Sequence, residues 1–153
     1  MADINGEAWI ADVSNLAQIF RYSYAGASLG TIGLNAANTR PTGIAAVNGE
    51  AWVVDSNDNI YRYRYGGAFL GTLALAVDNA RPEGIAEIND EVWVVNFQPP
   101  AAAVIFRYDY SGSLLGSFPL NVNNTRPQGI TEFDGACWVM DESPPDTMYR
   151  YVY

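Results

Sequence analysis

The chain has 153 residues, of which 49% are hydrophobic, and a formal net charge of −9. It is therefore long and apolar enough for one domain with a buried core. All eight positive charges are Arg, and the absence of Lys and His excludes Schiff-base chemistry, imidazole general-base catalysis and the commonest metal ligand. The acidic balance argues against nucleic acid and anionic membranes as partners. No apolar run is long enough for a transmembrane segment, and we expect no secretory signal at the N-terminus.

The predicted elements repeat along the chain. Trp occurs at positions 9, 52, 93 and 138, separated by 43, 41 and 45 residues, in the similar settings NGEAWIAD, NGEAWVVD, NDEVWVVN and DGACWVMD. Each Trp is followed by IFRY, IYRY, IFRY or MYRY, and an Arg-Pro-x-Gly-Ile segment joins successive units. Such a period is typical of repeat architectures.

Each unit is predicted to contain four short strands. In the second unit, strand A covers 43–47, strand B carries Trp52, strand C is the aromatic run 60–65 and strand D covers 70–75. Asn-Gly and Gly-Gly dipeptides mark the tight turns after strands A and C. No segment has apolar residues at a helical period over a useful length. Four-stranded units of 41–45 residues predict an all-β fold, a β-propeller.

The repeat also predicts where each blade begins and ends. We expect one repeat domain over 1–153, with blade 1 at about 1–40, blade 2 at about 41–81, blade 3 at about 82–126 and a partial blade 4 at about 127–153. Aligning the first two units places Met1 on Ile44, so the chain begins inside a strand A. It ends with a strand C, so the last blade lacks its outer strand and fifteen strands are expected.

These motifs carry a family resemblance. The succession P-x-G-I-A, W-V-V-D and I-Y-R-Y-x-Y-x-G-x-x-L-G resembles the blades of NHL-type and SMP-30-like propellers over essentially the whole chain. The resemblance implies the propeller fold. It leaves the function open, because that group includes scaffolds, lectin-like binders, lyases and lactonases.

Spacings within the units locate the variable loops. The Arg of each Arg-Pro dipeptide precedes the next Trp by 12 residues in all three cases. The strand-C Arg precedes the next Arg-Pro dipeptide's Arg by 19 residues in all three cases. Only the separation between each Trp and the following strand-C Arg varies, between 10 and 14 residues. All length variation therefore lies in the B–C connections, which emerge on the same face as the D–A loops. Loops on a rigid scaffold commonly carry binding residues. We expect the functional face to be this one, formed by the connections 13–18, 56–59, 97–103 and 142–147.

Several repeated residues have structural explanations. The four Trp lie mid-strand and are expected to pack in the core, and Cys137, in an apolar run, is expected to be a small buried hydrophobe. The residue three positions after each Trp is expected to tie its loop by hydrogen bonds to backbone amides; a Ca²⁺-holding carboxylate ring is the weaker alternative. The strand-C Arg residues are expected to stack on aromatic rings.

The candidate ligand-binding residues all belong to the variable face. The Arg residues before Pro either tie blade to blade or form a cationic ring for a carboxylate, phosphate or acidic glycan. Neighbouring loop residues complete the candidate site. The set consists of Arg40, Arg81, Arg126, Phe97, Gln98, Asp58 and Glu142. No catalytic residue, metal ligand or cofactor is predicted.

Three functions remain open. Catalytic residues normally break a repeat, whereas here the acidic positions follow it, which favours a non-catalytic binding or structural scaffold for a glycan or protein partner over an enzyme. The alternative is a small lactonase- or lyase-like propeller enzyme that uses carboxylates and a divalent metal. A component of a larger assembly, such as a virion or cell-surface protein, is the third possibility and would place the chain outside the cell.

The incomplete last blade also bears on assembly. Propellers commonly close with four to eight blades, and an unclosed set would expose an apolar blade face at each end. We expect self-association, with two chains meeting head to tail in an eight-bladed ring; a fragment of a longer propeller and a higher cyclic oligomer are the alternatives.

Overall fold

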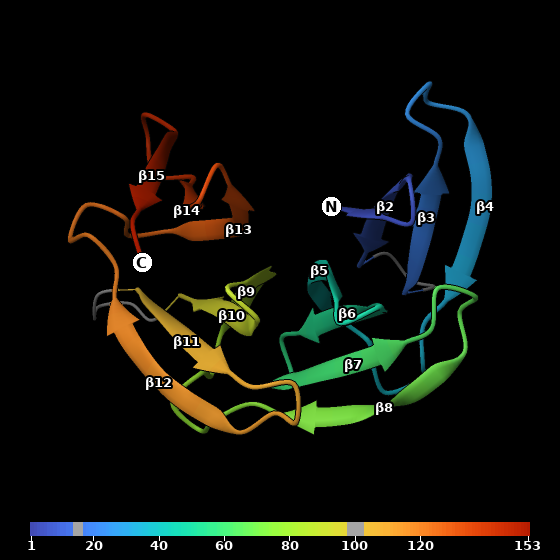
Figure 1. The fold of residues 1–153 in the computed structure, drawn as a ribbon, viewed down its shortest axis with the longest axis horizontal. Helices are drawn as coiled ribbons and strands as arrows, with labels where there is room; N and C mark the ends of the chain where they lie inside the picture. The colour runs from blue at the N-terminus through green and yellow to red at the C-terminus, as the bar shows by residue number, and fades with distance from the viewer. Residues whose placement is uncertain (14–16, 98–102) are drawn as a thin grey trace.

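The computed structural model describes residues 1–13, 17–97 and 103–153, and within these it contains four antiparallel sheets arranged around a common centre (Figure 1). Each sheet is one blade, and its strands are neighbours in chain order. This confirms the predicted all-β propeller, including a last blade of three strands. The described residues contain no helix that could cross a membrane.

The strand bounds follow the repeat closely. Blade 1 contains β1 (Ala2–Ile4), β2 (Glu7–Asp12), β3 (Gln18–Tyr22) and β4 (Ser28–Gly33). Blade 2 contains β5 (Pro41–Val47), β6 (Glu50–Asp55), β7 (Asn59–Tyr63) and β8 (Phe69–Ala74). Blade 3 contains β9 (Pro82–Ile88), β10 (Glu91–Asn96), β11 (Val104–Tyr108) and β12 (Leu114–Pro119). Blade 4 contains β13 (Pro127–Phe133), β14 (Ala136–Asp141) and β15 (Thr147–Tyr151).

The predicted hairpin turn between strands A and B is confirmed. Asn48 and Gly49 have φ angles of 46° and 77°. Two consecutive positive φ values define a type I′ turn, whose twist matches that of antiparallel strands. The same turn recurs in the other three blades, so the sequence sets the strand pairing locally before any blade meets its neighbour.

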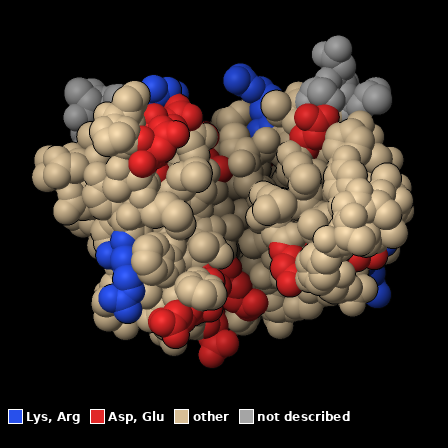
Figure 2. Space-filling view, turned by 90° about the horizontal axis from the view of Figure 1, so that it is seen from above, with Lys and Arg blue, Asp and Glu red and all other residues tan. Residues whose placement is uncertain are grey.

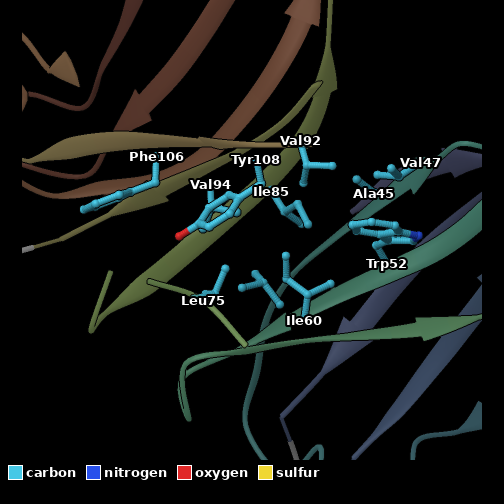
Figure 3. Packing of buried hydrophobic residues seen from close by; sticks show 11 residues of the cluster. Ala45, Val47, Trp52, Ile60, Leu75, Ile85, Val92, Val94, Phe106 and Tyr108 are labelled. Carbon is cyan, nitrogen blue, oxygen red and sulfur yellow. The ribbon is translucent and has the colours of Figure 1, made fainter. Parts of the chain in front are cut away.

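The core consists of three apolar layers, each between two successive blades. In the middle layer, Trp52 of β6 packs with Val92 and Val94 of β10 and with Tyr108 of β11 (Figure 3). Val54 of β6 belongs to the same cluster. Equivalent residues fill the layers between blades 1 and 2 and between blades 3 and 4. Because strand residues alternate between the two faces of a sheet, each central blade contributes one face to each adjoining layer.

Blades 2, 3 and 4 each bind the preceding blade through a polar contact of a Tyr hydroxyl. The hydroxyl of Tyr63, in blade 2, accepts hydrogen bonds from the Asn35 backbone amide at 3.0 Å and the Asn38 side chain at 3.2 Å, both in the loop that leaves blade 1. Tyr108 and Tyr151 repeat this contact with Asn79 and Asn124. Burial, opposed by the hydrogen bonds it accepts, raises the pKa of Tyr63.

Two of the four strand-C Arg residues, Arg21 and Arg62, stack on Trp rings, as predicted. The guanidinium of Arg62 lies 5.2 Å from the Trp52 ring centroid and donates to both carboxylate oxygens of Glu50, at 2.8 and 2.9 Å. Trp52 Nε1 also donates to Glu50. This side-chain hydrogen bonding, mainly from Arg62, lowers the pKa of Glu50. The same group recurs in blade 1 with Arg21, Trp9 and Glu7.

Blade 4 departs from the expected packing of the Trp residues. Trp9, Trp52 and Trp93 are buried, as predicted, whereas Trp138 is only half-buried. The physical reason is that no blade of the described chain covers the face of β14 on which Trp138 lies. Cys137, on the opposite face, is fully buried, and burial raises the pKa of its thiol to about 12.

Replacing Tyr63 by Phe tests the polar tie between blades. The Tyr63→Phe variant should lose about 1–3 kcal/mol of unfolding free energy, because the buried Asn38 side chain and the Asn35 amide lose their acceptor. Denaturant unfolding measures this loss. Tyr65→Phe is the matched control, since no hydrogen bond of the Tyr65 hydroxyl occurs among the described residues. Equal losses in both variants would contradict the role of the tie.

Candidate functional site

The loops of the predicted functional face are fixed to one another through their backbones. Asp55, at the end of β6, accepts from the Arg40 amide at 2.8 Å, and the Ser56 amide donates to the Arg40 carbonyl at 3.0 Å. Asn96 and Asp141 bind the amides of Arg81 and Arg126 in the same way. The predicted loop-tying role is confirmed for these three acceptors. The acceptors bind the Arg backbones, so the guanidinium groups are not engaged by them.

Two of the predicted Arg residues share one hollow. It has a volume of about 420 Å³ and lies between the loops that lead into β5 and β9. Arg40 and Arg81 line it together with Ser56, Thr42 and Glu83. Both Arg residues are exposed, and the guanidinium of Arg40 forms no ion pair within 1–13, 17–97 and 103–153. The structure therefore brings two exposed Arg residues to a space of the size that small ligands occupy.

Neighbouring side chains position two of the predicted Arg residues, Arg81 and Arg126. The guanidinium of Arg81 lies 4.7 Å from the ring centroid of Phe97, a contact that restrains the side chain. Arg126 pairs with Glu142 at 2.5 Å and is not among the residues that line the hollow. Phe97 thus contacts the side chain of Arg81, and Glu142 contacts the side chain of Arg126. Gln98 lies outside the described residues.

Glu83 is the site residue that the sequence analysis missed. It lies in the hollow between two Arg-bearing loops, and burial, opposed by nearby Arg81, raises the pKa of its carboxyl. The signal was in the sequence: the position between Pro and Gly is Thr42 in blade 2, Glu83 in blade 3 and Gln128 in blade 4. This is a chemically varied position in an otherwise constant Arg-Pro-x-Gly-Ile motif.

Asp58 lies apart from this hollow. It is in the turn between β6 and β7 with a φ of 65°, and its backbone binds Asp55 and Leu75. These contacts indicate a role in the turn. Among the described residues, no group of three His, Cys, Asp or Glu side chains is placed to hold a metal ion.

The opposite face of the molecule, which carries the A–B hairpin turns, is negatively charged near the A strands. A second hollow of about 270 Å³ is lined by the A strands of all four blades and includes Asp3, Glu87 and Glu132. Figure 2 shows Arg side chains with neighbouring carboxylates at the upper end of a furrow, and a larger group of carboxylates at its lower end. Glu87 accepts from the Tyr110 hydroxyl and the Asn48 amide. An anion would therefore bind more favourably on the variable loop face than on the hairpin-turn face.

Comparison with known proteins supports the fold. No protein-family model and no curated protein sequence matches this chain. Among solved structures it is similar to glutaminyl cyclase from Myxococcus xanthus (TM-score 0.77, 11% identity), over 97% of this chain and 69% of that one. It is also similar to virginiamycin B lyase from Staphylococcus aureus (0.64, 20%, covering 97% and 53%). The WD40 repeats of RRP9 are a further match (0.64, 10%, covering 97% and 48%).

These similarities establish a β-propeller and nothing finer. Two of the three proteins are enzymes by name and the third is a WD40 repeat protein, and one fold commonly carries unrelated functions. The chain spans about two thirds of the length of the cyclase and about half the length of the other two.

The raised pKa of Glu83 gives a pH-dependent prediction. A carboxyl whose pKa is higher in the folded state than in the unfolded chain destabilises the fold once pH rises above its unfolded value. Glu83→Gln should therefore unfold at a higher temperature than the original protein at pH 7. The difference should vanish below about pH 4, where the carboxyl is protonated in both states. Thermal melts across this range measure it, and a variant less stable at pH 7 would contradict the assignment.

Proposed function

We propose that the protein is a non-catalytic β-propeller scaffold that binds an anionic partner, a glycan or a protein, on its variable loop face. The observation that carries this proposal is that two exposed Arg residues, Arg40 and Arg81, line one hollow. Guanidinium forks bind carboxylates and phosphates through paired, charge-assisted hydrogen bonds.

The support lies in how the two groups are held. Hydrogen bonds to Asp55 and Asn96 fix the backbones of Arg40 and Arg81. A ligand therefore does not have to order these loops, which lowers the entropic cost of binding. Stacking on Phe97 restrains the Arg81 side chain in the same way.

An acidic glycan suits the surroundings better than an extended acidic protein segment. The hydroxyl-bearing Ser56 lines the hollow, and hydroxyl groups can bind sugar hydroxyls as donors or acceptors. The volume of about 420 Å³ suits one or a few sugar units. The NHL-type resemblance of the repeat belongs to this proposal, since lectin-like binders occur in that group.

Substitution of the two Arg residues tests the proposal. The double variant Arg40→Gln, Arg81→Gln should bind polygalacturonate, a carboxylated polysaccharide, at least tenfold more weakly, because it loses charge-assisted hydrogen bonds of about 1.5–3 kcal/mol each. Isothermal titration measures the affinity, with neutral dextran as the negative probe. The matched control is Arg64→Gln, an exposed Arg after β7 that lies outside the hollow.

Two outcomes would contradict the glycan assignment. One is an equal loss in the Arg64→Gln control, which would indicate charge alone. The other is the absence of binding to every carboxylated polysaccharide together with binding to an acidic peptide that depends on Arg40 and Arg81, which would favour the protein partner.

A small propeller enzyme is the second candidate, and Glu83 is the observation that favours it. A carboxyl with a raised pKa in a hollow is suited to general acid catalysis. If it used a divalent metal, the purified protein would contain that metal and a chelator would abolish turnover. For the binding scaffold we expect no stoichiometric metal and an unchanged melting temperature with the chelator.

A further inference from the structure

Blade 4 carries an apolar face that no other part of the described chain covers. This face consists of Phe133 on β13, Trp138 and Met140 on β14, and Met148 on β15. Their repeat equivalents in blade 2 are Val47, Trp52, Val54 and Ile60, all buried in the layer against blade 3. Met140 is 49% exposed, whereas its equivalent Val54 is 0% exposed. The free face of blade 4 therefore has the side chains of an interior blade face.

Blade 1 carries the complementary free face. It consists of Ile10 on β2, Phe20 and Tyr22 on β3, and Tyr24 after it. Their equivalents in blade 2 are Val53, Tyr61, Tyr63 and Tyr65, which pack against blade 1. Ile10 is 38% exposed and Val53 is 0% exposed. Within the chain, a face equivalent to the free face of blade 4 packs against a face equivalent to the free face of blade 1. The two free faces are therefore complementary.

Two details show where contacts are missing. Tyr65 and Tyr153 place their ring edges on the Trp of the preceding blade, Trp9 and Trp93, at centroid distances of 6.1 and 5.3 Å. In the described chain Trp138 has no such ring beside it, while Tyr24, the equivalent of Tyr65, is 68% exposed. The free end of blade 4 and the free end of blade 1 each lack the residue that the other carries.

The strand-A glycines also show that no described strand packs against the free face of blade 4. A Cβ on Gly43 would lie 3.0 Å from the Gly84 Cα, and one on Gly84 would lie 3.2 Å from the Gly129 Cα, so successive A strands approach closely at these positions. A Cβ on Gly129 would meet no atom within 4 Å. The third glycine of this row therefore faces open space where another A strand would pack.

We propose that blade 4 of one copy packs against blade 1 of a second copy of this chain, head to tail. The contact continues the three blade-to-blade layers already present within each chain. Each copy offers one face of each kind, so two copies satisfy both faces and close a ring of eight blades. Blades 1 and 4 flank the opening in Figure 1, and each copy widens this opening to admit its partner.

The ring would also duplicate the proposed binding site. The two copies are related by an axis along the centre of the ring, so both loop faces lie on the same side. Two Arg40–Arg81 hollows on one face would allow a polymeric anion to bind both at once. This consequence rests on the proposed function, whereas the contact between copies does not.

Paired substitutions test the head-to-tail contact. Met140→Asp disables the free face of blade 4 and Ile10→Asp that of blade 1, and both positions are exposed in the single chain, so folding should survive. The original protein should have twice the 16.7 kDa chain mass in dilute solution, and each variant alone should be monomeric. An equimolar mixture should form a dimer again, through the intact blade 4 of one variant and the intact blade 1 of the other. Native mass spectrometry measures all four samples.

Controls separate this contact from other associations. Val77→Asp, at an exposed loop position outside both faces, should remain dimeric. Circular dichroism confirms that each variant is folded. A monomeric original protein would overturn the proposal, and so would a dimer that survives either single substitution or variants that fail to restore each other. Since no ligand is present in these measurements, they do not depend on the fate of the proposed function.

Discussion

The fold depends on the apolar contact between the faces of successive blades. A single sheet of this chain has apolar residues on both faces, so one blade alone would leave both in water. The layer around Trp52, Val54, Val92 and Val94 removes one face of blade 2 and one of blade 3 from solvent together. At about 25 cal/mol per Å² of buried apolar surface, this term far exceeds the contribution of any single hydrogen bond in the structure. The blades therefore stabilise each other in series, as in other repeat proteins.

Outside the apolar layers, polar contacts fix the loops and the Arg side chains. On the loop face, Asp55, Asn96 and Asp141 fix the loops that enter the next blade. Near the turn face, Glu7 and Glu50 bind the Arg that covers the neighbouring Trp ring. Blade 4 has Ala136 where these blades have Glu, and Trp138 Nε1 donates instead to the Phe133 carbonyl. Blade 4 thus retains the apolar pattern of the repeat but not this polar group.

The sequence predicted the features that depend on local pattern. The period of the Trp residues and the dipeptide turns predicted all fifteen strands, and the constant spacings around them placed the length variation in the B–C connections. It predicted that Asp55 would bind backbone amides, but not that one of them would be the Arg40 amide of the adjoining loop, because that partner depends on the angle between two loops. The separation of Asp58 from the hollow depends likewise on the path of its turn. Trp138 was expected to be buried because its local sequence matches that of the other three Trp residues, whereas its burial depends on which blade packs beside it.

Glu83 decides how the proposed site would respond to its ligand. In the hollow, burial raises its pKa, Arg81 opposes the rise, and Glu142 adds to it. An anion bound between Arg40 and Arg81 would add another negative charge nearby and occupy the guanidinium that favours the ionised carboxyl. Both effects raise the pKa of Glu83 further. Anion binding and protonation of Glu83 therefore favour each other, so affinity increases as pH falls toward the pKa of this carboxyl. Thr42, the equivalent residue in blade 2, has no charge to titrate, which makes Glu83 the residue that couples this hollow to pH.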